Sequence, residues 1–371
     1  MDTNQLALAR IERAVFGLRA LYSQYGYAQY KMSKFEEYDL YVRNKSFLVS
    51  DHVITFTDMG GKLMALKPDV TLSIVKNSRD LPDKVQKVYY DENVYRVPRG
   101  GLSYREIMQV GLECIGDIDS YCVAEVLTLA AKSLAQISKD YVLDVSHLGI
   151  VSALIDGMGA SEEGRRRILV CVGEKNVHEL DDILVDEGIE PQRAELLKRL
   201  MTADGDCDKT LDMLKAECCG DAAKELSDVL AAVRAVLPDG RIRIDFSVVN
   251  DMNYYNGIVF KGFVNGIPTS ILSGGQYDNL MLKMGKKSGA IGFAVYLDLL
   301  DELGNEAAEY DTDVVLLYDA REDVSAVSCA VNRLVASGAR VTARKTAPTK
   351  LKYKTLMKLE NGEVKTLETH A

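Results

Sequence analysis

The segment that decides the fold is residues 104–116, YREIMQVGLECIG. Polar or small side chains recur in it at a spacing of two and share one face of a strand: Arg105, Gln109, Gly111 and Glu113. The positions of the opposite face are apolar: Met108, Val110, Leu112 and Cys114. This pattern predicts a sheet that packs against helices on one side and faces either solvent or a cleft on the other.

Strand-like segments flank this one on both sides. They occur at residues 51–66, 87–95, 141–145, 241–249, 257–264 and 268–272. Within the first of them, Asp58, Met59, Gly60 and Gly61 separate two β-rich runs, which is typical of a hairpin. Residues 289–300 resemble a strand or turn that enters a hydrophobic helix.

Helical spacing dominates three other regions. Apolar residues from Leu8 to Tyr22 recur at this spacing, and Gly26 then favours a left-handed helix end. Residues 123–137 repeat the pattern. Residues 146–236 contain helical clusters broken by turns rich in Gly and Asp, which predicts a helical insertion.

These patterns predict an α+β fold, in which a mixed and largely antiparallel sheet is flanked by helices. We expect a core formed by residues 1–145 and 237–305, the helical insertion at 146–236, and a small α/β domain at 312–371. The missing βαβ alternation argues against a Rossmann domain. A phosphate-binding Walker loop does not fit either, because Leu280 occupies the position of its first glycine.

The net charge, the hydrophobic pattern and the cysteines of the chain bear on which partners and cofactors to expect. The net charge of −10 disfavours nucleic-acid binding through the overall field of the protein. Positive charge gathers near the C-terminus, as a solvated surface or a local RNA-binding face: Arg340, Arg344, Lys345, Lys350, Lys352, Lys354 and Lys358. No apolar run approaches the ~20 residues of a membrane span, so we expect a cytoplasmic protein. The seven cysteines form no paired CxxC motif, so no zinc site, disulfide framework or other cofactor is expected.

Four segments place polar and aromatic residues inside otherwise apolar sequence. They are residues 66–71, 95–113, 250–264 (NDMNYYNGIVFKGFV) and 273–280 (SGGQYDNL). Carboxylates bind an ammonium group, whereas phenols and amides orient a polar heterocycle. With few fixed cations among them, the segments suit a zwitterionic ligand that carries a ring. An ordinary wet sheet face is the alternative.

The same segments resemble those of histidyl-tRNA synthetases. Residues 67–71 resemble the Arg-Pro-Glu-Gly-Thr element, 95–116 class II motif 2, 250–260 the Arg-Gly-Leu-Asp-Tyr-Tyr signature, 273–280 the Gly-Gly-Arg-Tyr-Asp-Gly loop and 289–300 motif 3. Tyr25, Gly26 and Tyr27, with Glu36, resemble the dimer-forming motif 1. The order holds over residues 1–305, and the resemblance implies a class II synthetase-like antiparallel sheet.

The resemblance also implies a pocket for a histidine-like ligand. Its residues would be Asp69, Thr71, Arg96, Gln109, Glu113, Tyr254, Tyr255 and Tyr277. Asp69 stands for the glutamate at the α-amino group, and Glu113 and Tyr255 are expected to hold the imidazole. Arg96 matches the motif 2 arginine that meets the α-phosphate of ATP.

Three positions depart from the family at its arginines. Asn250 replaces the catalytic arginine, Gln276 the arginine of the glycine loop, and Leu299 the motif 3 arginine that holds ATP. The motif 2 glutamate falls on or near Pro98. Activation brings a carboxylate onto a phosphorus atom, and losing one preorganised charge contact costs ~10²–10³ in rate. The departures therefore imply no catalytic residues and no aminoacylation.

One branch of the family resembles this combination, namely the regulatory subunits of ATP phosphoribosyltransferase. The resemblance implies partnership with the short catalytic subunit of that enzyme in the first step of histidine biosynthesis, and histidine feedback. It also implies a homodimeric core within a hetero-octamer. The tail from Thr312 resembles a shortened anticodon-binding domain, so tRNA is not an expected partner. Two alternatives stay open: a histidyl-tRNA synthetase or related enzyme with altered chemistry, and an RNA-binding or stress-sensing paralogue that uses the basic tail.

Overall fold

The architecture is that of a computed structural model, which describes residues 10–48, 52–80, 84–97, 103–203, 207–217, 220–249, 254–303 and 310–370. Contacts divide the chain into two compact units. One spans Ile11–Leu303 and the other contains Gly304–Ala371. Each unit is described by itself.

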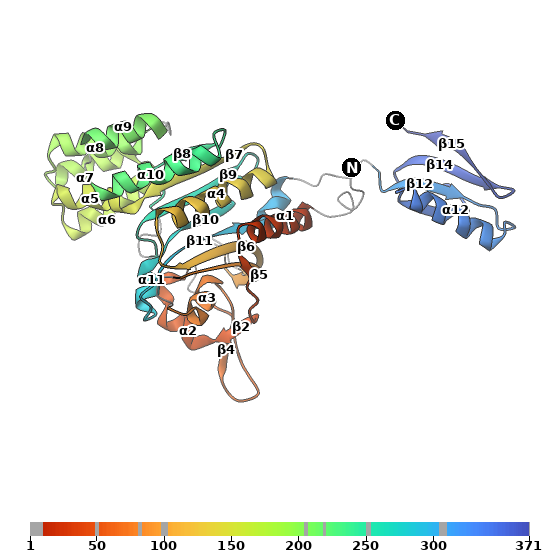
Figure 1. Cartoon of the computed structure of the whole chain (residues 1–371), viewed down its shortest axis with the longest axis horizontal. Coiled ribbons are helices and arrows are strands. Elements are labelled where there is room, and N and C mark those ends of the chain that lie inside the picture. The colour runs from red at the N-terminus through yellow and green to blue at the C-terminus, as the bar shows by residue number, and fades with distance from the viewer. Residues whose placement is uncertain are drawn as a thin grey trace. The chain divides into compact units, whose positions relative to one another are not determined.

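The first unit is built on a sheet of eight described strands (Figure 1). In spatial order they are β1 (Ala28–Gln29), β5 (Val85–Arg96), β6 (Arg105–Gly116), β11 (Gly289–Tyr296), β10 (Leu272–Gln276), β9 (Ile258–Val264), β7 (Tyr141–His147) and β8 (Ile242–Ile244). The two outermost pairings, β1 with β5 and β7 with β8, are parallel, and the pairings between them are antiparallel. The predicted mixed, largely antiparallel sheet is confirmed.

Two long helices cover one face of this sheet, as Figure 1 shows: α1 (Arg10–Gln24) and α4 (Ser120–Ile137). Leu18 of α1, Val126 of α4 and Leu112 of β6 are fully buried in one core cluster between the layers. Burying each such side chain contributes ~1.5–3 kcal/mol. This packing places the predicted apolar face of residues 104–116 on the helices, so the polar face points the other way.

The predicted helical insertion consists of helices in all its described parts. They are α5 (Leu148–Met158), α6 (Glu162–Glu174), α7 (Val177–Asp186), α8 (Pro191–Met201), α9 (Cys207–Glu217) and α10 (Asp221–Val236). Helix α10 packs against α4, and the core of the helices is continuous with that of the sheet. The exact boundaries of the insertion stay a prediction.

A second core cluster lies against the other face of the sheet. It includes Ile107 and Ile115 of β6 and Val75 of helix α3 (Thr71–Asn77). The surrounding elements are β2 (Phe35–Glu37), α2 (Tyr38–Arg43), a 3₁₀ turn η2 (Lys45–Phe47), β3 (Thr55–Thr57), β4 (Leu63–Leu66) and α11 (Asp278–Lys283). These elements flank a cleft face and do not leave it as an open wet sheet.

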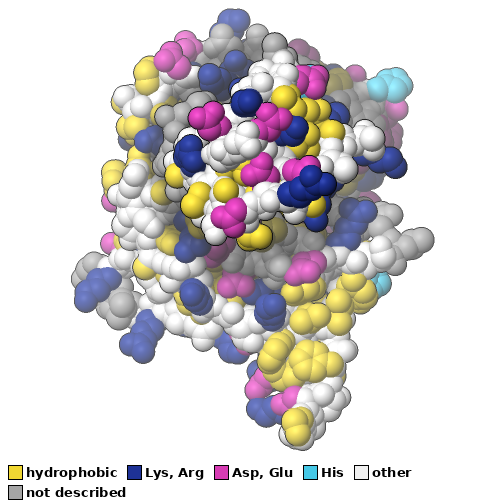
Figure 2. All heavy atoms as spheres, turned by 90° about the vertical axis from the view of Figure 1, so that its right-hand side faces the viewer, with side chains coloured by type: hydrophobic (Ala, Val, Ile, Leu, Met, Phe, Trp, Pro, Cys, Tyr) yellow, Lys and Arg dark blue, Asp and Glu magenta, His cyan; other side chains and the backbone are white. Residues whose placement is uncertain are grey.

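The predicted hairpin at residues 51–66 is confirmed, because β3 and β4 pair in antiparallel fashion and β2 pairs with β4. This three-stranded sheet projects from the first unit in Figure 1. Phe35, Phe56 and Met59 are among its exposed apolar side chains. Figure 2 shows hydrophobic side chains gathered on this projection.

Two predicted strand limits and one predicted helix type are wrong. The strand expected at 268–272 is β10, Leu272–Gln276, so the supposed glycine loop is itself a central strand. A Cβ atom on Gly274 would collide with the carbonyl oxygen of Gly292, so the glycines serve close strand packing. The strand expected at 241–249 shrinks to β8, Ile242–Ile244, and the hydrophobic helix after β11 is a 3₁₀ helix, η3 (Leu297–Leu303).

The second unit is a small α/β structure, as predicted in type. Its sheet runs β13 (Val341–Arg344), β12 (Thr312–Leu317), β14 (Tyr353–Glu360), β15 (Glu363–Thr369), with helix α12 (Val324–Ala336). Asn361 and Gly362, at φ 54° and 81°, form the turn between β14 and β15. Two of its basic residues are ion-paired: Arg340 contacts Asp313, and Lys358 contacts Glu360.

Among the described residues, no helix has both the length and the apolar character needed to cross a bilayer.

Candidate functional site

The candidate site lies on the face of the large sheet that points away from α1 and α4. Two glycines on neighbouring strands, Gly292 of β11 and Gly275 of β10, are paired in register and form its floor. A Cβ atom on Gly292 would collide with the carboxylate of Glu113. A Cβ atom on Gly275 would come within 2.8 Å of the ring of Tyr255. Glu113 and Tyr255 therefore lie side by side, each over one glycine of the floor.

Glu113 is the best-ordered polar group of the site. It is 2% exposed, and its two carboxylate oxygens accept hydrogen bonds from the Thr71 hydroxyl at 2.7 Å and the Tyr277 hydroxyl at 2.5 Å. Burial raises the pKa of Glu113 to about 8, although both hydrogen bonds act in the opposite direction. A buried carboxyl of this kind gains most from a cationic partner, which the described residues around it do not supply.

Tyrosines form one wall of the site. The ring of Tyr254 lies 4.6 Å from that of Tyr255 and 5.9 Å from that of Tyr277, centroid to centroid. Phe47 extends the stack at 5.8 Å from Tyr254. Burial raises the pKa of the Tyr254 and Tyr277 phenols well above the usual value, so both stay neutral hydrogen-bonding groups.

Asp69 supplies the second acid, and it lies just before helix α3. Its Oδ1 accepts a hydrogen bond from the backbone N–H of Leu72 at 2.9 Å, so the short helix holds the side chain in place. Burial raises the pKa of Asp69, and the field of Asp69 in turn raises the pKa of Glu113. The two acids thus lie close enough for the charge of one to act on the other. We call Asp69, Thr71, Glu113, Tyr254, Tyr255 and Tyr277 the acidic pocket.

Arg96 lies at the end of β5, beside this pocket. It is 7% exposed, and its guanidinium carbon lies 5.7 Å from the ring of Tyr296. Within the described residues its guanidinium makes no hydrogen bond to a carboxylate. Arg105 stands directly opposite it on β6, and Asp298 follows on η3. We call Arg96, Arg105, Tyr296 and Asp298 the arginine end.

Gln109 connects the two parts of the site. It is 5% exposed on β6, and its register partners are Glu92 on β5 and Tyr296 on β11. Glu92 itself accepts a bond of 2.5 Å from Lys67, whose side chain is fully buried. The sheet face between the acidic pocket and the arginine end is thus polar, and its acid Glu92 is already paired with Lys67.

Two of the three positions that depart from the arginine pattern have structural roles. The side-chain oxygen of Gln276 accepts a hydrogen bond of 2.6 Å from the backbone N–H of Ile258. Leu299 packs against the main hydrophobic core. The third position, Asn250, and the motif 2 position Pro98 lie outside the described residues.

Sequence reasoning missed several residues that take part in the site. The hydroxyl of Tyr90 lies over Gly111, where a Cβ atom would collide with it, and Tyr90 is fully buried. Its position, two residues before Glu92 on β5, puts it on the cleft face by simple alternation. Tyr296 continues the alternation of Gly292 along β11, whereas Lys67 and Asp298 lie beyond the ends of strands, where alternation does not show the direction of a side chain.

The geometry suits binding of a small zwitterion or cation with a polar ring. Two acids attract positive charge, and the neutral phenols pack against a ring and orient its polar atoms. Among the described residues, no group of three or more His, Cys, Asp or Glu side chains could hold a metal ion.

Comparison with known sequences gives the same two names repeatedly. The sequence profile described as histidyl-tRNA synthetase matches residues 2–300. The ATP phosphoribosyltransferase regulatory subunit of Oceanobacillus iheyensis is 29% identical over 74% of this chain and 69% of its own length. That of Caldanaerobacter subterraneus is 30% identical over 76% and 75%. The histidine–tRNA ligase of Methanocaldococcus jannaschii is 26% identical over 82% and 74%.

Solved structures share the fold. A Bacillus halodurans protein described as an ATP phosphoribosyltransferase regulatory subunit/histidyl-tRNA synthetase superposes with a TM-score of 0.74 at 22% identity, covering 94% of this chain and 93% of that one. A chain of the ATP phosphoribosyl transferase (HisG:HisZ) complex of Thermotoga maritima superposes with a TM-score of 0.62 at 18% identity, covering 76% and 96%.

Proposed function

The chain belongs to the histidyl-tRNA synthetase family, and within it to the regulatory subunits of ATP phosphoribosyltransferase; from this premise we propose that it regulates that enzyme without catalysing a reaction itself. In this role it would act in the first step of histidine biosynthesis, in the cytoplasm, together with a short catalytic subunit. The acidic pocket would hold histidine or a closely similar ligand as a signal.

The observation that carries the proposal is the contrast between the hydrogen-bonded acidic pocket and two nearby positions at which the family has arginine and this chain does not. Glu113 keeps two hydrogen bonds and two neighbouring tyrosines that suit an imidazole. At the arginine positions, Gln276 is engaged with the backbone of β9 and Leu299 with the core. A carboxylate and a triphosphate cannot be brought together without fixed cations, so binding without activation is what this arrangement supports.

Asp298 adds to the same argument. It is an acid placed at the arginine end, and its Oδ1 is buried without a hydrogen-bond partner in the described structure. Its pKa is raised by burial and lowered by Arg96 and Arg105, so it shares their surroundings. A negative charge there opposes the approach of a polyphosphate.

The proposal is tested by mixing the purified chain with the short catalytic subunit from the same organism. We expect a stable hetero-oligomer in size-exclusion chromatography with light scattering, built on a homodimer of this chain; a hetero-octamer is the proposed stoichiometry. We also expect phosphoribosyl transfer to rise on mixing and to become sensitive to histidine. No complex and no change in rate would refute the regulatory role.

Retained Arg96 favours a second candidate, a synthetase with altered chemistry, and the likeness to an archaeal histidine–tRNA ligase agrees with it. Histidine-dependent exchange between ATP and pyrophosphate distinguishes the two. We expect no exchange above background at high protein concentration, and no salt-dependent binding of tRNA. A clear exchange signal would establish the synthetase instead.

A further inference from the structure

Lys261 lies on the cleft face of the sheet. It is the fourth residue of β9, and the next residue, Gly262, turns toward helix α4, where a Cβ atom would collide with Leu134. Strand alternation therefore turns Lys261 away from α4, to the same side as the acidic pocket. Its register partners are Ser273 on β10 and Asp144 on β7.

Lys261 is a charge without a partner in the described part of the chain, where its ammonium makes no hydrogen bond or ion pair. Its neighbour Asp144 is already engaged, because Arg243 donates to both of its oxygens at 2.8 and 2.9 Å. The three side chains together carry one net positive charge. An uncompensated ammonium on a half-buried surface favours an anionic ligand.

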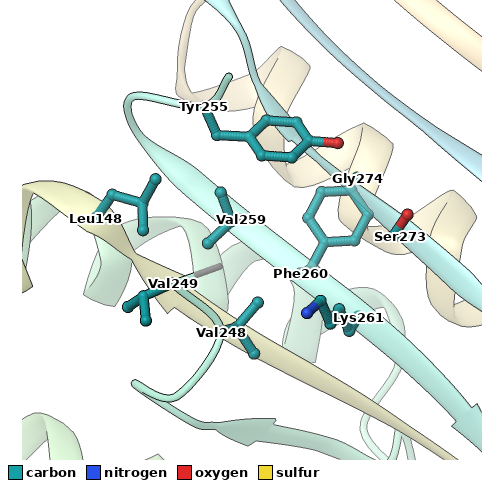
Figure 3. Close-up of a pocket in the computed structure, with 9 residues that line it drawn as sticks. All are labelled: Leu148, Val248, Val249, Tyr255, Val259, Phe260, Lys261, Ser273 and Gly274. Carbon is teal, nitrogen blue, oxygen red and sulfur yellow. The ribbon is translucent and has the colours of Figure 1, made fainter. Parts of the chain in front are cut away.

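A small cavity connects Lys261 with Tyr255. Figure 3 shows its lining, with Tyr255 and Lys261 at opposite ends of the group. Its other lining residues are Leu148, Val248, Val249, Val259, Phe260, Ser273 and Gly274. The space open to water-sized groups is about 20 Å³, which suits a group the size of a carboxylate and no larger.

The sheet geometry sets the reach of a ligand. The carboxylate of Glu113 lies over Gly292 on β11, and Lys261 is on β9, two strands away. Two strand spacings of about 5 Å, combined with the two-residue offset along β9 between Lys261 and Val259, the register partner of Gly275, give a separation of about 12 Å. An amino acid with an imidazole side chain, hydrogen-bonded at both ends at about 2.9 Å, spans a distance of this order. The ring of Tyr255 lies between the two ends, over Gly275.

We propose that Lys261 binds the carboxylate of an amino acid whose ring is held by Glu113 and Tyr255. Ser273 contributes a hydroxyl beside it, which already contacts the hydroxyl of Tyr296 at 2.9 Å. A phosphate would require several converging donors, whereas one ammonium and one hydroxyl suit a monoanion. This inference rests on the proposed amino-acid pocket and names the residue that selects for the carboxylate.

The test compares two ligands on matched variants of the full chain. Histidine and histamine share the imidazole and the amine, and histamine lacks the carboxylate. By calorimetry, Lys261→Met is expected to weaken histidine binding about 10- to 100-fold and leave histamine binding unchanged. Lys261→Arg should retain most of the histidine affinity. Lys224→Met, an exposed residue of α10 that pairs with Asp228, removes the same charge elsewhere and should change neither ligand.

Three other outcomes would count against Lys261 as the residue that binds the carboxylate. Equal weakening of both ligands by Lys261→Met would show that the residue supports the structure and does not contact the carboxylate. Unchanged histidine affinity would overturn the Lys261 assignment and leave the acidic pocket intact. A wild-type chain that binds no histidine, yet assembles with and stimulates the catalytic subunit, would refute both the pocket and Lys261 without touching the regulatory role.

Discussion

The acidic pocket and the arginine end lie on the same sheet face, yet they differ in how completely their polar groups are used. In the acidic pocket, both oxygens of Glu113 accept hydrogen bonds and Asp69 is fixed at the start of α3. At the arginine end, Arg96 and Arg105 face each other as like charges, and Asp298 has a buried oxygen without a partner. Like charges in register destabilise a strand pair.

This difference between the acidic pocket and the arginine end bears on the function that the site can support. Recognition of a small ligand needs only a few fixed polar groups, and hydrogen bonds hold both Glu113 and Asp69 of the acidic pocket. Activation would need cations arranged around a polyphosphate, and side chains with structural roles now occupy two of those positions. This difference supports the two proposed properties, namely ligand binding at one end and no activation of the ligand at the other.

The largest effect is expected from Glu113→Gln, which removes the central acid of the pocket and keeps its shape. A neutral amide cannot pair with an imidazolium or imidazole as a carboxylate does, so histidine affinity should fall about 100-fold by calorimetry. Glu106→Gln, on the exposed part of the same strand, is the control and should bind normally. Similar affinities in both variants would mean that the ligand binds elsewhere.

Gly292→Ala should disturb the acidic pocket, because Gly292 lies in the sheet directly under the carboxylate of Glu113. The new methyl group would collide with the Glu113 carboxylate and with the carbonyl oxygen of Leu112, and overpacking of this kind costs about 1–3 kcal/mol. We expect a lower midpoint of urea unfolding and weaker binding of the ligand. Gly220→Ala is the matched control, since no atom lies within 4 Å of its added Cβ. A Gly292→Ala protein as stable as this control would contradict the packing described here.

The pH dependence of stability should reveal Glu113. Its pKa is about 8 in the folded chain and near 4.5 when unfolded, so between these values the folded state holds a proton that the unfolded state has released. The free energy of unfolding should therefore fall as pH rises from about 4.5 to 8, by at most about 1.4 kcal/mol per unit. Urea titrations across this range should show the slope, and Glu113→Gln should reduce it. An unchanged slope in the variant would assign it to other groups.

The smallest effect concerns Asp298. Replacing it with Asn removes a negative charge beside Arg96 and Arg105, so binding of ATP should become about 3- to 10-fold tighter, although still weak. Equilibrium dialysis measures the change, and Asp301→Asn on the same turn is the control. If Asp298→Asn bound ATP no better than Asp301→Asn, the acid would have no part in excluding nucleotides.

Alternation on β6 made much of this site predictable. It placed Gln109 and Glu113 on one face and Val110 and Leu112 on the other, and the structure confirms both faces. Such a strand encodes its environment locally, because its side-chain period is two. The family resemblance then identified which of the polar side chains to expect together.

The rest depended on contacts that local patterns do not contain. The family resemblance gave residues 273–280 as a glycine loop, whereas Gly274 and Gly275 lie in β10 and allow three strands to pack closely. The role of Gln276 was equally hidden, since nothing near it in sequence shows that its side chain reaches the backbone of Ile258. Lys67 and Asp298 enter the site from positions just beyond the ends of β4 and β11, where the course of the chain is set by tertiary packing.

The hydrogen bond from Ile258 to Gln276 limits which side chains position 276 can hold. Gln276 now fastens the start of β9, and Gly257 is restricted to glycine because a Cβ atom there would collide with the Gln276 side chain. Restoring an arginine at this position would therefore break a backbone contact before it regained any charge. A guanidinium has no acceptor atom, so an arginine at position 276 could not take over the anchoring of β9 by the Gln276 amide oxygen.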